Sequence, residues 1–178
     1  MAGETLRVLA FGAHPDDCDI NVGGLAVKYA RLGHKVKFVS LTNGDTGHFS
    51  MGGGPLAKRR QEEAQRSARI AGIEYEVLDI HNGQLLPTLE NRWRVVCIIR
   101  EFQPDLIITN RPNDYHPDHR YGSQLVADAA YTVTVPNVMA LTPHLNYNPV
   151  VAYWGDRFRR PYPFRSEEHT SELQSRST

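Results

Sequence analysis

The chain has 178 residues, of which 40% are hydrophobic and 22% are charged, as is typical of a soluble globular protein with one domain. Twenty basic and twenty acidic residues give no net charge, which argues against a general binder of nucleic acid or of anionic membranes. No apolar run approaches about 18 residues and no signal pattern opens the chain, so we expect no membrane span. Two cysteines, Cys18 and Cys97, indicate reduced thiols in a cytoplasmic protein rather than a disulfide framework.

The first predicted element is a short buried strand over residues 6–11, which ends at Gly12. His14, Asp16 and Asp17 follow it closely, and two adjacent carboxylates at the edge of a core are costly without a cation or hydrogen bonds. We therefore predict a divalent metal, zinc above others, on His14 and Asp17, with Asp16 as general base toward a metal-bound water. A structural alternative stays open, in which Asp16 or Asp17 caps the next helix and His14 is a loop histidine.

A helix over residues 20–32 and a strand over residues 35–42 are predicted next, followed by a long loop over residues 43–55 that contains five glycines. A loop of this length in a compact domain is usually functional or mobile. We interpret it as a substrate loop in which His48 contacts the ligand. A flexible connection with a solvated His48 is the alternative.

The rest of the chain alternates between helix and strand. The predicted helices cover residues 56–71, 89–102 and 120–131, and the predicted strands cover residues 74–80, 106–109 and 150–154. This alternation predicts an α/β fold that is Rossmann-like, with three layers (α/β/α) and a mostly parallel sheet. Right-handed crossovers give the strand order 3-2-1-4, so the first and fourth strands are neighbours at the point where ligands bind in such sheets. The residues that follow these two strands are therefore predicted to meet.

A second group of histidines and acids follows the fourth strand, in the loop over residues 110–119. His116 and His119 stand three apart, and one of them can be a third metal ligand that leaves a fourth position for water, as catalytic zinc requires. The other can stabilise an oxyanion or protonate a leaving amine. Asp118 can orient a histidine, and Asn113 is expected to contact the substrate. A surface loop with a helix cap is the structural alternative.

Residues 13–17 (Ala-His-Pro-Asp-Asp) and 116–119 (His-Pro-Asp-His) together resemble the paired motifs of the PIG-L/LmbE-like family of zinc-dependent de-N-acetylases. The family includes deacetylases of mycothiol and bacillithiol biosynthesis and the enzyme acting on N-acetylglucosaminyl-phosphatidylinositol. The resemblance covers about residues 5–135 and implies a metal site on His14, Asp17 and His119. Zinc is the implied cofactor, and another divalent metal is compatible with these ligands.

Further roles are implied by the same resemblance. It implies that Asp16 is the general base, that His116 is the oxyanion-stabilising or acid histidine, and that Asp118 orients His116. Arg60 is similar to the family arginine that contacts substrate. Cys18 stands where many members have Glu or Val, at a position that is not a ligand in the family.

The implied activity is hydrolytic removal of an acetyl group from an N-acetyl amino sugar conjugate, a small-molecule partner. Two alternatives stay open: a non-catalytic Rossmann-like module that binds a small molecule, and an inactive truncated fragment. The sequence leaves the oligomeric state undecided, and a homo-oligomer is compatible with it.

The C-terminal part of the chain departs from this pattern. Members of the family continue well beyond residue 178, so we expect residues 1–164 to be a deacetylase domain that is incomplete at its C-terminus. Residues 165–178 have no apolar periodicity and look like translated sequencing-adapter read-through. A genuine disordered tail is the alternative.

Overall fold

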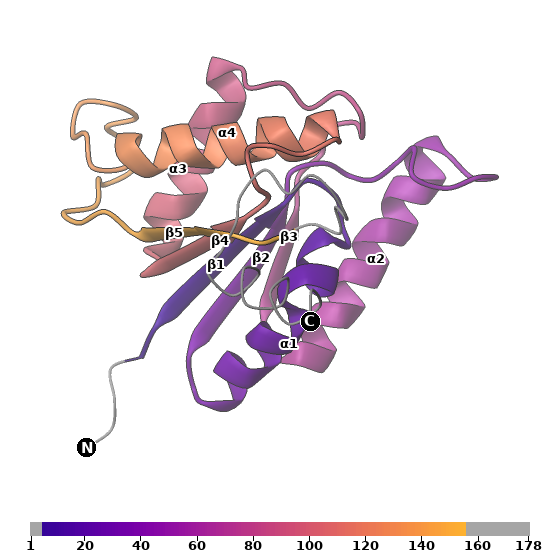
Figure 1. Cartoon of the computed structure of the whole chain (residues 1–178), viewed down its shortest axis with the longest axis horizontal. Helices are drawn as coiled ribbons and strands as arrows, with labels where there is room; N and C mark the ends of the chain where they lie inside the picture. The colour runs from indigo at the N-terminus through magenta and orange to yellow at the C-terminus, as the bar shows by residue number, and fades with distance from the viewer. Residues whose placement is uncertain (1–4, 156–178) are drawn as a thin grey trace, which may run out of the picture.

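Five parallel strands form one sheet in residues 5–155, which are the residues that the computed structural model describes (Figure 1). The strands are β1 (Arg7–Gly12), β2 (Lys35–Ser40), β3 (Glu74–Val77), β4 (Leu106–Thr109) and β5 (Val150–Tyr153). Their order is β3-β2-β1-β4-β5, and every neighbouring pair is parallel. The predicted order 3-2-1-4 is therefore confirmed, and β5 extends the sheet beyond β4.

Four helices cover the two faces of the sheet: α1 (Asp17–Arg31), α2 (Gly53–Ala71), α3 (Leu89–Phe102) and α4 (Pro117–Thr132). Successive side chains of β1 point to opposite faces of the sheet, so they pack against different helices. Val8 and Ala10 pack with α1 and α2, whereas Leu9 and Phe11 pack with α3 and α4. The strand is apolar on both sides because both of its faces are buried. The structure is the predicted α/β fold with three layers.

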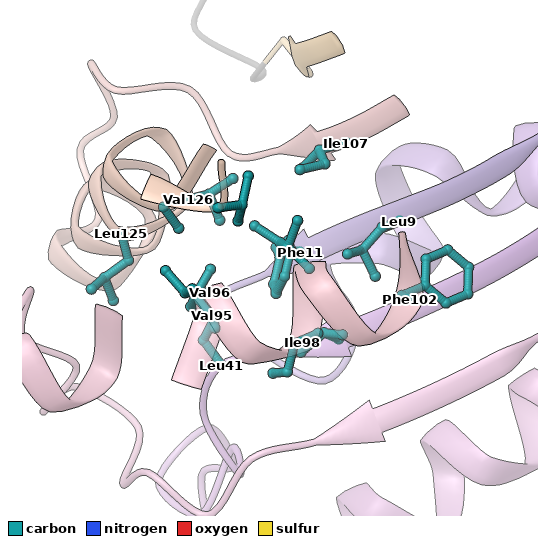
Figure 2. Close-up of a cluster of buried hydrophobic side chains, with 14 of the residues drawn as sticks. Leu9, Phe11, Leu41, Val95, Val96, Ile98, Phe102, Ile107, Leu125 and Val126 are labelled. Carbon is teal, nitrogen blue, oxygen red and sulfur yellow. The ribbon is translucent and has the colours of Figure 1, made fainter. Parts of the chain in front are cut away.

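The core between the sheet and the pair α3 and α4 holds the ends of β1 and β4 in place. Figure 2 shows Phe11 among aliphatic side chains of α3 and α4, beside Leu9 of the same strand and Ile107 of the neighbouring strand β4. Phe11, Ile107, Val126 and Leu125 are fully buried. These strands carry the residues that precede both predicted motifs, so the scaffold under the motifs is tightly packed.

A buried arginine fixes the far end of α4. Arg100 of α3 is 2% exposed, and its guanidinium donates to six backbone carbonyl oxygens, those of Thr132, Val133, Val135, Val138, Met139 and Thr142. Carbonyl groups at a helix C-terminus carry partial negative charge, which favours a cation there. Arg100 thereby ties the last turn of α4 and the following loop to α3, while the first turn of α4 remains at the edge of the sheet.

Three helices, α1, α2 and α4, begin three residues earlier than predicted, and for α1 and α4 this changes where the motif residues lie. Helix α1 begins at Asp17 and helix α4 begins at Pro117, because Asp16 and His116 occupy the N-cap positions. Proline is favoured at the first position of a helix, so Pro117 starts α4 rather than preventing it.

The predicted domain end at residue 164 and the predicted tail over residues 165–178 lie outside the described residues. Among residues 5–155, no helix combines the length and the apolar character that crossing a membrane requires.

Candidate metal centre and active-site cleft

Both predicted motifs lie at the carboxyl ends of neighbouring strands. Residues 13–17 follow β1, residues 116–119 follow β4, and these two strands pair directly. Between the motifs is an open cleft of about 310 Å³. Of the predicted site residues, its lining includes His14, Asp16, Asp17, Arg60, His116 and His119. The prediction that the ends of the first and fourth strands meet is confirmed.

Asp17 is held as a carboxylate in the first turn of α1. Its Oδ2 accepts the backbone N–H groups of Ala13 (2.8 Å) and His14 (3.0 Å). Burial by itself raises the pKa of Asp17, but the hydrogen bond with His14 and the nearby His119 outweigh burial and lower it. The N-terminal end of a helix also favours a negative charge. Asp17 is therefore an ionised oxygen donor at the floor of the cleft.

The donor atoms of His14, Asp17 and His119 form a compact triangle. Nδ1 of His14 is 3.3 Å from Nε2 of His119 and 3.6 Å from Oδ2 of Asp17. The third side, from Nε2 of His119 to Oδ2 of Asp17, is 3.5 Å. Ligand atoms around a tetrahedral zinc ion, with bonds of about 2.0–2.1 Å, lie about 3.3–3.4 Å apart. The three atoms are thus spaced as three corners of such a shell, so the residues present fit a zinc ion.

Asp118 lies behind His14, on the side away from this triangle. Oδ2 of Asp118 is 3.3 Å from Nε2 of His14 and accepts the backbone N–H of Gly83 at 2.6 Å. Burial disfavours the charged imidazole, but the hydrogen bonds to Asp118 and Asp17 outweigh it and raise the pKa of His14 to about 9. Asp118 is expected from the sequence to orient His116; its carboxylate contacts His14, whereas its backbone N–H is the group that contacts the His116 ring.

His116 is the N-cap of α4, and its ring is the capping group. Nδ1 of His116 accepts the backbone N–H of Asp118 at 3.2 Å. In a neutral imidazole with Nδ1 as acceptor, the proton is on Nε2. Burial, followed by the nearby charges of His14 and His119, lowers the pKa of His116 and favours this neutral form. His116 therefore presents a neutral N–H donor in the wall of the cleft.

The three imidazoles also define a second possible set of metal ligands. Ligand nitrogens of His14, His116 and His119 all lie within 4.8 Å of one another. Both sets share His14 and His119, and they differ in whether Asp17 or His116 is the third member. Because the cap bond directs the proton of His116 to Nε2, the set with Asp17 suits a cation better.

Asp16 faces the cleft and is paired with Arg60 of α2. Nη2 of Arg60 is 2.6 Å from Oδ2 of Asp16, and Nη1 is 3.2 Å from Oε2 of Glu63. Asp16 occupies the N-cap position of α1 but makes no side-chain capping hydrogen bond. The structural alternative makes Asp16 or Asp17 the helix cap; Asp16 does hold the N-cap position, but its carboxylate is engaged by Arg60 rather than by the helix backbone. Arg60 contacts a predicted catalytic carboxylate and also lines the cleft.

The glycine-rich loop reaches the cleft through its glycines rather than through His48. Gly44 and Gly47 line the cleft. Gly44 has φ +71°, and an added Cβ would lie 2.9 Å from Cδ of Pro15, so only glycine fits this wall. His48 instead accepts the backbone N–H groups of Ser50 and Met51 within its own loop. It is absent from the cleft lining, as is the exposed Asn113, and the structure does not bring either residue to the site.

Several residues of the site were not singled out from the sequence. Asn82 and Tyr115 line the cleft, Gly83 binds Asp118, and Oδ2 of Asp114 lies 3.2 Å from Nδ1 of His119. Asn82 and Gly83 read only as a turn in the sequence. Tyr115 and Asp114 immediately precede His116, and that proximity is the signal that could have identified them.

An α/β domain with a histidine and carboxylate cleft at the reversal point of its sheet defines a Rossmann-like protein with a candidate metal centre. Residues 9–130 match the family model for PIG-L, described as GlcNAc-PI de-N-acetylase. The chain belongs to the PIG-L family.

Curated relatives of the chain are deacetylases of N-acetyl sugars by name. A diacetylchitobiose deacetylase from Thermococcus kodakarensis is 35% identical over 150 residues, covering 78% of this chain and 56% of the relative. A 1D-myo-inositol 2-acetamido-2-deoxy-alpha-D-glucopyranoside deacetylase from Corynebacterium diphtheriae is 26% identical over 166 residues, covering 77% and 57%. The chain thus spans little more than half the length of these relatives.

Solved structures give the same fold. The N,N'-diacetylchitobiose deacetylase from Pyrococcus horikoshii superposes with a TM-score of 0.78 at 26% identity, covering 98% of this chain and 68% of that one. The 4-carboxy-2-hydroxymuconate hydratase from Pseudomonas putida superposes with a TM-score of 0.74 at 23% identity, covering 82% and 64%. The second likeness is to the fold alone, and it shows that this fold also supports an enzyme of another class.

Proposed function

We propose that this chain carries the centre of a metal-dependent amide hydrolase that removes an acetyl group from an N-acetyl amino sugar conjugate. The observation that carries the proposal is the triangle of His14, Asp17 and His119, whose sides of 3.3–3.6 Å suit a zinc ion. The names of the relatives support the choice of an N-acetyl sugar as substrate class. Bound zinc would polarise the amide carbonyl and lower the pKa of a water molecule.

Asp16 is the proposed general base. It lines the cleft next to the ligand Asp17, and Arg60 engages its Oδ2 at 2.6 Å. Oδ1 is then the oxygen that takes the proton of the attacking water. The ion pair with Arg60 restrains the carboxylate of Asp16, and such positioning lowers the cost of reaching a reactive geometry.

His116 is the proposed donor to the tetrahedral oxyanion. Its Nδ1 accepts the N–H of Asp118, which leaves Nε2–H available on a wall of the cleft. A donor whose position is set before the reaction stabilises developing negative charge without a cost of reorganisation at that moment. The same proton would prevent Nε2 from binding a metal, which supports Asp17 as the third ligand.

The cleft itself suits a small polar substrate. Its volume is about 310 Å³, and Tyr115, 67% exposed, stands at its edge beside His116 and His119. The side chains of Asn82 and Arg60 add polar groups to the wall.

Both cysteines are free thiols in the structure, which supports the proposal of a cytoplasmic protein.

Acetate release tests this proposal. We expect the zinc-loaded protein to release acetate from N,N'-diacetylchitobiose, to lose this activity after chelation, and to regain it when zinc is added back. Release that survives complete removal of the metal would contradict the proposal. Protein that binds zinc and the sugar but releases no acetate would favour the binding module instead.

A further inference from the structure

We infer that Asp114 is a positioning residue that holds His119 in the tautomer needed for metal binding. The inference rests on the proposed metal site, because it concerns which ring nitrogen of His119 is free to bind an ion. Asp114 lies in the loop between β4 and α4 and is absent from the lining of the cleft. It therefore acts through His119 rather than on the substrate.

Asp114 contacts both histidines of the second motif. It is 8% exposed, and its Oδ1 accepts the backbone N–H of His116 at 2.9 Å. Its Oδ2 is 3.2 Å from Nδ1 of His119. The guanidinium of Arg120 donates to the backbone carbonyls of Asp114 (2.8 Å) and Tyr115 (2.9 Å), which fixes the loop around the carboxylate. One buried carboxylate is thus shared between the backbone of His116 and the ring of His119.

The burial of Nδ1 decides where the proton of His119 resides. Nδ1 is buried and makes no hydrogen bond in this structure, and Oδ2 of Asp114 lies 3.2 Å from it. A buried N–H without an acceptor is costly, and the carboxylate of Asp114 is the acceptor at hand. A carboxylate accepts but does not donate, so Nδ1 carries the proton and Nε2 keeps its lone pair. Nε2 is the atom that faces His14 and Asp17.

The contact between Asp118 and His14 repeats this arrangement. There too, a buried carboxylate oxygen lies 3.3 Å from the ring nitrogen that points away from the triangle of donor atoms. A carboxylate behind a ligating imidazole fixes its tautomer and orientation, and its loss typically weakens metal binding about 10- to 100-fold. The structure therefore has one such carboxylate for each imidazole of the proposed zinc site, Asp118 for His14 and Asp114 for His119.

Asp114→Asn is the variant that tests the inference. The amide oxygen of the new side chain can still accept the backbone N–H of His116, but its NH₂ group would face Nδ1 of His119. That donor favours the tautomer with the proton on Nε2, which removes the lone pair from the metal side. We expect the zinc affinity, measured by competition with a chromophoric chelator, to fall about 10- to 100-fold. The control is Asp128→Asn, which removes the same charge from the ion pair with Arg92 and should leave the zinc affinity unchanged.

A second measurement does not depend on the variant. Nitrogen-15 NMR of the metal-free wild-type protein should show the neutral ring of His119 with its proton on Nδ1. A proton on Nε2 in the wild type, or an unchanged zinc affinity in folded Asp114→Asn, would overturn the inference. A wild type that binds no zinc would instead refute the proposed function, and the NMR result would still decide the tautomer.

Discussion

Replacing Asp16 with asparagine should leave the metal in place and lower kcat by about 10²- to 10⁴-fold, the range of a lost general base. An amide cannot take the proton of the attacking water, whereas its oxygen can still accept from Arg60, which contacts Oδ2 at 2.6 Å. The proposed ligands His14 and Asp17 are unchanged by the substitution. The measurements are kcat for acetate release and the zinc content of the same preparation.

The matched control for this variant is Asp19→Asn. Asp19 also lies in the first turn of α1, but its carboxylate accepts a hydrogen bond from Ser67 of α2 and it does not line the cleft. We expect Asp19→Asn to keep kcat within a few fold of the wild type. An Asp16→Asn variant with wild-type kcat would refute the role of Asp16 as base, and one without zinc would make Asp16 part of the metal site.

Replacing His116 with asparagine should lower kcat by about 10²- to 10³-fold while zinc stays bound, as expected when one oxyanion donor is removed. Asparagine is chosen because it is among the best N-cap residues, so the cap of α4 that the His116 ring now supplies is kept. The loss of activity then reports the chemistry of the ring rather than the stability of the helix. Zinc content and the thermal midpoint of the variant should match those of the wild type.

The same variant decides whether Asp17 or His116 is the third metal ligand beside His14 and His119. If His116→Asn folds but loses zinc, the set of three imidazoles within 4.8 Å holds the ion and Asp17 is not the third ligand. If zinc is retained and kcat is unchanged, His116 does not stabilise the oxyanion.

The sheet and the meeting of the two motifs could be predicted because they follow from long-range regularities. The apolar runs that became β1 and β4 set the strands, and right-handed crossovers make those strands neighbours. Helix starts were less predictable, since an imidazole cap at His116 is not among the preferred N-cap side chains. The first turns of α1 and α4 consequently carry Asp17, Asp118 and His119, which read as loop residues from periodicity alone.

The partner of each carboxylate behind the histidines could not be predicted from the sequence, for a different reason. The bond from Gly83 to Asp118 joins residues 35 apart, and its existence depends on how the turn after β3 folds over α4. Which histidine Asp118 faces is likewise set by the direction of the first turn of α4, and spacing could not distinguish His14 from His116. For His48, the loop closes on its own backbone and leaves its glycines to line the cleft, which composition does not indicate.

The metal content of the purified protein, measured beside that of His14→Ala, tests whether His14, Asp17 and His119 hold a zinc ion. We expect about one zinc ion per chain in the wild type and none in the variant at equal thermal stability of the metal-free forms, because His14 supplies one corner of a triangle that needs all three. A well-folded wild type without metal, or a His14→Ala variant that retains zinc with wild-type affinity, would contradict it.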